Sequence, residues 1–433
     1  MLRLLGGILL VTSESRAVDP WPAEAHTSAI QLTSVDAGLN TVNWSGAFWN
    51  PETRTLWLAC NSGYFWALVE NGAGGFRVAT NASGTLAKWS PGGDLESIGQ
   101  VAYTSSAVFL MDEDGWIKEY DASQYGVVSL TRSWDIRAHC AEVGGSGSEG
   151  LAFVPDEWLR RQQFTDTNGI PRVSTNGMGG LMLIGHQSGG YVHAFDLNPT
   201  NTQFGYVGRY KTGRSETAGL EFDRASGKFY VWHNTGDNYL EVVGLQSYPS
   251  GTNRVLRPLA EYYGPRTGNL EGFALTPSTD TNTWCFITDD DNSGGEAVMW
   301  YREFAPSDDV DADELSDGYE LWHFGSLTQT TGSADADLDG LSNTGEWIAG
   351  TDPTNDVSSL ALVGPVFEGT NFVLSWASTT GRVYAVCECG QLNTGFAFAV
   401  TSGIRATVPL NVSTMSVPPG VTSGFYRISV QSP

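Results

Sequence analysis

Two segments of the chain repeat one spacing of acidic and amide side chains, with 26 residues between equivalent positions. Aspartates stand at positions 1, 3 and 5, leucine at position 7 and glutamate at position 12. A calcium loop uses this order, because short carboxylates surround the ion, position 7 supplies a backbone carbonyl and the last glutamate binds through both oxygens. The predicted ligands are Asp309, Asp311, Asp313, Leu315, Asp317 and Glu320 in the first loop, and Asp335, Asp337, Asp339, Leu341, Asn343 and Glu346 in the second. The sequence therefore predicts two bound Ca²⁺ ions.

The acidity of the chain is concentrated around these loops. The 433 residues include 23 basic and 48 acidic side chains, a net charge of −25, and residues 308–356 alone hold 13 acids and no lysine or arginine. Charge runs usually form solvated tails, but these acids keep a fixed spacing among large apolar residues. We expect an ordered calcium-binding connector over residues 306–356, with helical turns at 319–324 and 346–349. Glu314 stands where such a loop favours glycine, so we expect a strained turn there.

This connector resembles dockerin-like and thrombospondin type 3-like calcium repeats more than a full EF-hand, because no helix is predicted before the first loop. The resemblance implies a segment that calcium stiffens, since the clustered carboxylates repel one another without the ion. The acidic balance of the whole chain argues against nucleic acid or an anionic membrane as a partner, because phosphate binding needs clustered lysine and arginine.

A second pattern recurs five times between residues 40 and 305. Each copy is a short strand, a turn and a second apolar strand that ends in a polar residue. The equivalent positions near the start of the first strand are Ser45, Glu96, Glu149, Ala218 and Glu271, separated by 51, 53, 69 and 53 residues. Repeats of about this length with four short strands are typical of β-propeller blades.

We therefore expect a mainly β protein with a five-bladed β-propeller over residues 28–305. The fifth copy is one strand short, and residues 28–34 are the candidate to supply it. A six-bladed ring and an all-β sandwich are the alternatives. The glycine that follows the repeated acid suits first strands that crowd together near the axis of the ring.

In a propeller the start of each first strand and the end of each second strand open on the same mouth of the central channel. This places acids and imidazoles together, and the candidate catalytic residues are Glu96, Glu149, Glu271, Asp112, His186, His233 and Asp289. Such a ring suits a further Ca²⁺ ion or, because crowded carboxylates raise one another's pKa, acid–base chemistry. The plain structural alternative is that these groups cap backbone amides in the loops.

Residues 269–274 followed by 287–292, and residues 43–46 followed by 50–57, resemble the esterase-like phytase and SdiA-regulated β-propeller families. The resemblance implies an extracytoplasmic propeller that binds calcium, with a phosphoester or ester hydrolase role. The chain departs from that pattern where Ser45 and Ala218 replace the acid. The nearest basic residues, Arg209, Lys211 and Arg214, are few for a polyanionic substrate.

The two ends of the chain complete the expected organisation. Residues 1–17 have the basic start and short apolar run of a secretory signal peptide, and no segment is long enough to span a membrane. Residues 358–433 read as short strands separated by turns, a β-sandwich similar to fibronectin type III domains. We expect a secreted calcium-binding protein whose propeller mouth engages a small-molecule, glycan or protein ligand. The alternative is a metal-dependent phosphoester or ester hydrolase acting at that mouth.

Overall fold

The computed structural model describes residues 17–24, 30, 43–143, 146–369, 371–391, 395–396, 398–416 and 424–431. The chain is mainly β, with 46% strand and 6% helix, which confirms the predicted class. It divides into two compact units, residues 1–310 and 311–433. No helix in the described part of the chain is long and apolar enough to cross a membrane. The expected signal peptide, residues 1–17, lies outside the described residues except at its last position.

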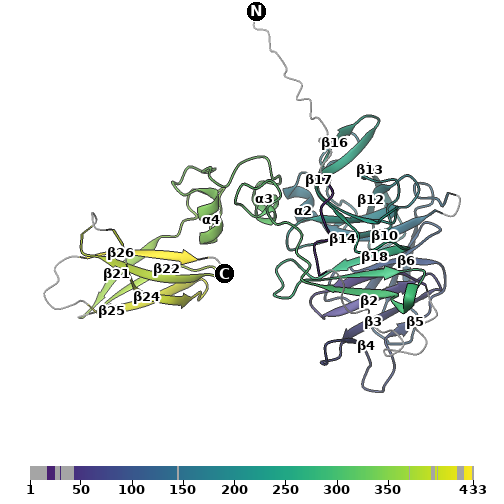
Figure 1. The fold of residues 1–433 in the computed structure, drawn as a ribbon, viewed down its shortest axis with the longest axis horizontal. Helices are drawn as coiled ribbons and strands as arrows, with labels where there is room; N and C mark the ends of the chain where they lie inside the picture. The colour runs from purple at the N-terminus through teal and green to yellow at the C-terminus, as the bar shows by residue number, and fades with distance from the viewer. Residues whose placement is uncertain are drawn as a thin grey trace, which may run out of the picture. The chain divides into compact units, whose positions relative to one another are not determined.

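Antiparallel sheets of consecutive strands build the first unit (Figure 1). The first sheet comprises β1 (Trp44–Asn50), β2 (Thr55–Cys60), β3 (Tyr64–Glu70) and β4 (Phe76–Val78), with β5 (Lys88–Trp89) paired to β3. The second comprises β6 (Leu95–Gly99), β7 (Ala107–Asp112), β8 (Trp116–Asp121) and β9 (Leu130–Asp135). The last comprises β18 (Leu270–Leu275), β19 (Trp284–Asp289) and β20 (Val298–Arg302). Strands of these lengths join through short turns, as the repeat predicts.

Between them lies an eight-stranded sheet that is nearly closed. One half runs through β10 (Ser148–Pro155), β11 (Gly180–His186), β12 (Tyr191–Leu197) and β13 (Phe204–Lys211). The other runs through β14 (Gly219–Phe222), β15 (Phe229–His233), β16 (Tyr239–Ser250) and β17 (Asn253–Tyr263). The halves are joined by a parallel pair between β13 and β17. The insertion after β10 begins with the short helix α2 (Asp156–Arg161).

The first strands of the five repeats lie against one another in a closed cycle, β1 to β6 to β10 to β14 to β18 and back to β1. Gly150 in β10 would bring a Cβ atom within 2.6 Å of the Leu220 side chain in β14, and Gly272 in β18 would bring one within 2.5 Å of the Ser45 carbonyl oxygen in β1. Figure 1 shows β6, β10, β14 and β18 near the middle of this unit. The glycine after the repeated acid is therefore required by close backbone approach.

Residues before β1 are tied to the last strands of the same unit. Asp19 exchanges two backbone hydrogen bonds with β17, donating to Glu261 and accepting from Tyr263. Ile30 donates its amide to the carbonyl of Val298 in β20 at 2.9 Å. The rest of the predicted outer strand, residues 28–34, lies outside the described residues.

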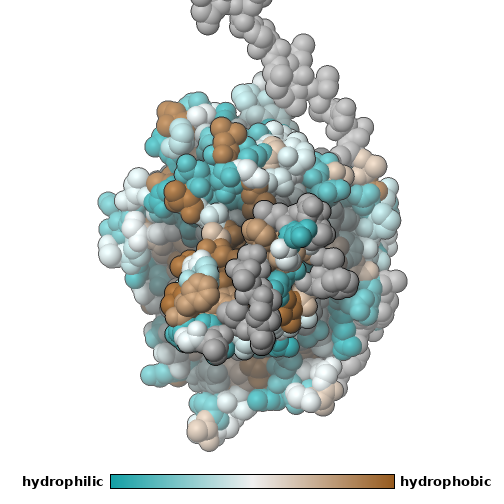
Figure 2. All heavy atoms as spheres, turned by 90° about the vertical axis from the view of Figure 1, so that its left-hand side faces the viewer, coloured by the Kyte–Doolittle hydropathy of each residue, from teal (hydrophilic) through white to brown (hydrophobic). Residues whose placement is uncertain are grey.

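The second unit contains two short helices and two three-stranded sheets. Helix α3 (Asp317–His323) and helix α4 (Asn343–Ala349) start slightly earlier than the predicted helical turns. One sheet comprises β21 (Leu362–Glu368), β22 (Asn371–Ala377) and β25 (Leu410–Ser416), and the other β24 (Phe398–Arg405), β23 (Val383–Cys389) and β26 (Phe425–Gln431). Trp376 and Tyr384 lie at the centre of the core that the two sheets share. Apolar side chains also stand exposed, Phe367 among them at 70%, and Figure 2 shows brown apolar groups among the teal polar surface.

Candidate functional site

A local irregularity turns the repeated glutamates of β6, β10 and β18 toward one another. Each of these strands shifts register against its neighbour at the glutamate, between Leu95 and Ser97, between Ser148 and Leu151, and between Leu270 and Phe273. A β-bulge of this kind leaves one residue out of the ladder and re-aims its side chain. Because the three strands lie in the same cycle, the bulges bring their glutamates to one place.

The side chains of Glu96, Glu149 and Glu271 meet there, with one oxygen from each carboxylate within 4.8 Å of the other two. All three residues are buried, with exposed fractions of 6%, 5% and 8%. Ser45, at the equivalent position of β1, is buried beside them, and its hydroxyl opposes the rise that burial causes in the pKa of Glu96 and of Glu271. We call these three glutamates the central carboxylate cluster. Of the seven residues that the repeat alignment placed at one mouth, these three form a single group.

Burial and mutual repulsion dominate the electrostatics of the central carboxylate cluster. Burial, followed by the charge of Asp94, raises the pKa of Glu96 to about 8. The pKa values of Glu149 and Glu271 are raised well above their ordinary range, first by burial and then by neighbouring carboxylates. Within the described residues no lysine or arginine forms a salt bridge with the cluster. Oε2 of Glu149 is buried and has no hydrogen-bond partner, so a group that water would ordinarily solvate stands uncompensated.

Glu96 also belongs to a second, more open group of acids. One oxygen from each of Asp94, Glu96 and Glu113 lies within 4.8 Å of the others. Burial and then the carboxyl of Asp94 raise the pKa of Glu113 to about 7. A carboxylate shared by two groups can bridge an inner and an outer ligand position. The acids therefore continue outward from the central carboxylate cluster.

The other predicted mouth residues have partners of their own and do not join the central carboxylate cluster. Asp112 accepts a hydrogen bond from Lys118 at 2.6 Å, and Asp289 accepts one from Arg266. His186 contacts the carbonyl of Ala141 through Nε2 at 3.0 Å. His233 is fully buried between the carbonyl of Glu216 and the carboxylate of Glu241. These contacts match the structural alternative, in which polar strand ends hold neighbouring loops, and a catalytic role for these four residues stays a prediction.

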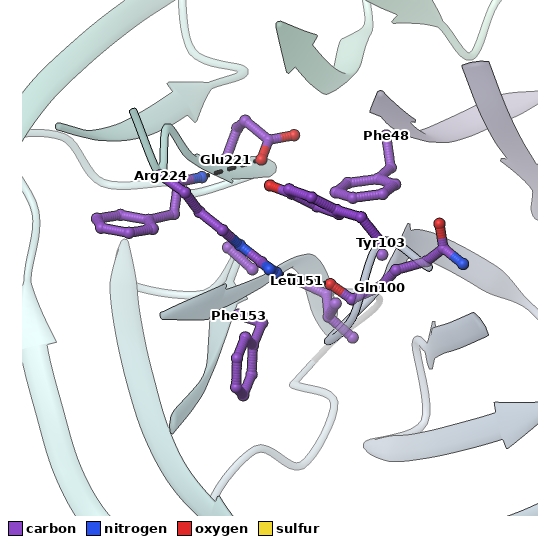
Figure 3. Close-up of a pocket in the computed structure, with 10 residues that line it drawn as sticks. Phe48, Gln100, Tyr103, Leu151, Phe153, Glu221 and Arg224 are labelled. Atoms are coloured by element: carbon purple, nitrogen blue, oxygen red, sulfur yellow. Dashed lines mark hydrogen bonds between the residues drawn. The ribbon is translucent and has the colours of Figure 1, made fainter. Parts of the chain in front are cut away.

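Arg224 closes the opposite ends of the first strands, a role that the sequence reasoning missed. Its guanidinium lies 4.1 Å from the ring centre of Tyr103 and 5.4 Å from that of Phe153, and it donates to the carbonyls of Gln100 and Val101 (Figure 3). Glu221 lines the same small pocket, and burial raises its pKa well above the ordinary value. The sequence showed only a turn over residues 223–227, because a buried arginine that stacks on a ring carries no local motif.

The second predicted calcium loop gathers acids that could hold a metal ion. Asp335, Asp337 and Asp339 bring one oxygen each within 4.8 Å of one another. Gly340 has φ of +98°, which suits the glycine expected in the sharp turn. Glu346 is buried, its Oε2 has no hydrogen-bond partner, and burial raises its pKa to about 7. Asn343 instead holds the loop, donating to Thr331 O and Thr330 Oγ1 and accepting from the amide of Ala336.

The residues of the first predicted loop that belong to the second unit are arranged similarly. Asp311, Asp313 and Glu320 form a group with one oxygen each within 4.8 Å of the others. Glu314 has φ of +71°, the left-handed conformation in which glycine is favoured, so the turn is strained as predicted. Leu315 and Asp317 are fully buried where α3 begins, and Asp309 belongs to the first unit.

Comparison with protein-family models and with curated proteins finds no match for this chain. The resemblances described above therefore stay expectations. The functional proposal therefore rests on the central carboxylate cluster and the two acidic loops.

Proposed function

We propose that the protein binds calcium or a similar hard divalent cation in the central carboxylate cluster of its first unit and in the two acidic loops of its second. The observation that carries this proposal is the buried Oε2 of Glu149, which lacks a hydrogen-bond partner. Leaving a buried polar atom unpaired costs about 1–3 kcal/mol, and more when the group is charged. A bound cation is the simplest group that compensates three buried carboxylates at once.

Calcium fits the donor set better than a softer metal. The cluster offers carboxylate oxygens from three glutamates and the hydroxyl of Ser45, with neither histidine nor cysteine within the described group. Calcium takes about six to eight oxygen ligands in flexible geometry and fills its remaining positions with water. Asp94, which is exposed, and Glu113 offer further carboxylate oxygens beside Glu96.

The cycle of first strands supports a five-bladed propeller as the fold of the first unit. Its five strands hold equivalent places in the repeat and contact one another in order. β1, β6 and β18 each start a sheet whose strands follow the order of the sequence, and β10 and β14 each start one half of the eight-stranded sheet. The two packed sheets of residues 362–431 support a fibronectin type III-like sandwich. Export from the cell rests on residues 1–17 alone and is part of the same proposal, since calcium loops of this kind suit a calcium-rich medium.

Hydrolysis of a phosphoester or ester is the second candidate function. One observation favours it: the raised pKa of Glu96, about 8, would keep a proton available for donation near neutral pH. The buried partners of His186 and His233 count against them as general bases at the same centre. Binding of a cation and ligand at the mouth therefore remains the leading proposal.

Calcium titration by isothermal calorimetry on chelator-treated protein tests the proposal. We expect three ions per chain, one of which is lost in Glu149→Gln and a different one in Glu346→Gln. Glu157→Gln is the control, because Glu157 lies exposed on α2. A wild-type stoichiometry that Glu149→Gln leaves unchanged would show that the central carboxylate cluster does not bind the ion. Calcium-dependent turnover of a nitrophenyl phosphate or acetate, abolished by Glu96→Gln, would favour the hydrolase.

A further inference from the structure

A pocket on the side of the first unit is lined by arginines and holds no acid. It measures about 170 Å³ and is formed by β13, by the tip of the β16–β17 hairpin and by the insertion that follows α2. Arg209 and Arg254 contribute its charge, and Thr167, Thr252 and Asn253 add neutral polar groups. This pocket is separate from every acidic group described above, and the proposed cation sites do not use it.

More than half of the described arginines of the first unit are paired with an acid. Eight of them form salt bridges with carboxylates, namely Arg54, Arg132, Arg137, Arg160, Arg161, Arg172, Arg214 and Arg266. Among the described residues, neither Arg209 nor Arg254 has such a partner. They are two of six described arginines of the first unit without a salt bridge, and in a chain with a net charge of −25 they face one pocket that no acid lines.

Arg209 is held in place by stacking rather than by a carboxylate. Its guanidinium lies 4.7 Å from the ring centre of Tyr191, and the side chain is exposed. Stacking uses the flat face of a guanidinium and leaves its N–H edge available. The Tyr191 hydroxyl in turn donates to Oδ1 of Asn253 at 3.4 Å, so the Asn253 amide nitrogen remains a donor for the pocket.

Arg254 is fixed by neutral acceptors. Its Nε donates to Ser247 Oγ at 2.7 Å, and its Nη2 donates to Thr165 Oγ1 at 2.8 Å and to Ser247 O at 2.9 Å. These bonds orient the side chain without neutralising its charge. The nearby acid Asp166 is engaged with Arg172 at 2.9 Å. The Nη1 group of Arg254 and the N–H edge of Arg209 remain as donors, and with an amide and hydroxyls around them they suit a small oxyanion.

We propose that this pocket binds the oxyanion group of a small ligand, a sulfate, phosphate or carboxylate. The inference is independent of the proposed cation sites, because it depends on different residues and on the opposite charge. The volume admits a small anion or the charged end of a larger ligand.

Sulfate binding to the calcium-loaded protein tests this proposal, measured by isothermal calorimetry at constant ionic strength with chloride as the balancing salt. We expect saturable binding that Arg209→Gln weakens at least tenfold. Arg302→Gln is the matched control, because Arg302 is also exposed and stacks on an aromatic ring, with its guanidinium 4.6 Å from the centre of Trp300. Parallel titrations of phosphate with calcium-free protein and of acetate distinguish the tetrahedral oxyanions from a carboxylate.

Two results would overturn the proposal: no saturable binding of any of the three anions to the wild type, or equal weakening in Arg209→Gln and Arg302→Gln. Arg209→Lys separates charge from geometry, since lysine keeps the charge but loses the planar fork. We expect its affinity to fall between those of the wild type and Arg209→Gln. Circular dichroism of each variant shows whether the fold is kept, and Arg209 is the chosen position because, unlike Arg254, it does not anchor the hairpin.

Discussion

Substitution of Glu149 by glutamine distinguishes two effects of the central carboxylate cluster: charge repulsion, which destabilises the calcium-free protein, and ion binding, which stabilises the loaded protein. Its carboxylate oxygens lie within 4.8 Å of those of Glu96 and Glu271. At an effective dielectric constant of about 20, two unit charges at that distance repel by about 3.5 kcal/mol. Removing one of three charges therefore removes two repulsions, about 7 kcal/mol in total when all three are ionised. The glutamates with raised pKa values take up protons, which removes most of this repulsion. We therefore expect the free energy of unfolding of calcium-free Glu149→Gln to exceed that of the wild type by about 2 kcal/mol at pH 8.

The same substitution removes one ligand of the bound ion, so its effect reverses when calcium is added. We expect the dissociation constant of the central ion to rise about 100-fold, equivalent to about 2.7 kcal/mol of lost ligand-induced stabilisation. Urea unfolding of the first unit at pH 8, with chelator and with saturating calcium, measures both effects on one sample. Glu157→Gln is the control and should change neither.

The opposite signs are what make this experiment decisive. If calcium-free Glu149→Gln is less stable than the wild type, the carboxylate has a structural partner and the reasoning from its buried Oε2 is wrong. If the calcium-induced shift is the same in both proteins, no ion binds at the central carboxylate cluster.

Three further outcomes follow from other parts of the chain. Glu346→Gln should lower the affinity of the second loop for its ion at least about tenfold. It should also speed limited proteolysis of the connector at a fixed calcium concentration. Burial raises the pKa of Glu221 in the folded protein above its ordinary value of 4.5, so this carboxyl destabilises the fold increasingly as pH rises above 4.5. In urea unfolding, the stability that Glu221→Gln gains over the wild type should therefore grow from pH 5 to pH 9. Gly272→Ala should lower the free energy of unfolding by about 2–4 kcal/mol, because its Cβ would lie 2.5 Å from the Ser45 carbonyl oxygen, whereas Gly390→Ala meets open space and should be neutral.

The repeat along the chain predicted most strands of the first unit. Equivalent positions in a repeat occupy equivalent places, so aligning Glu96, Glu149 and Glu271 was enough to predict that they converge. The loop spacing likewise predicted that acids gather in each loop, because ligand order along a 12-residue loop is a local property. That these acids bind calcium stays a prediction.

Pairing between side chains could not be read in the same way. Asp112 and Asp289 stand at the ends of their strands, whereas the central acids stand near the starts of theirs. The sequence predicts that both kinds of position lie at the mouth of the channel. What separates them is a partner, Lys118 in one case and Arg266 in the other. The β-bulges that aim the glutamates, and the stacking of Arg224 on Tyr103, likewise depend on three-dimensional packing that has no local sequence pattern.

The seam between the start and the end of the first unit sets a condition on its biosynthesis. Ser45 contacts Gly272, and Asp19 and Ile30 bond to strands near residues 262 and 298. At about 5–20 residues per second, a ribosome needs roughly 15–60 s to release that much chain. Throughout this interval the leading segment has no strand to join, and β1 lacks the contacts that β18 and β19 later make with it. The unit can thus be completed only after nearly all of it has been translated, which makes the nascent chain, rather than the finished protein, the form most exposed to aggregation and most dependent on chaperones.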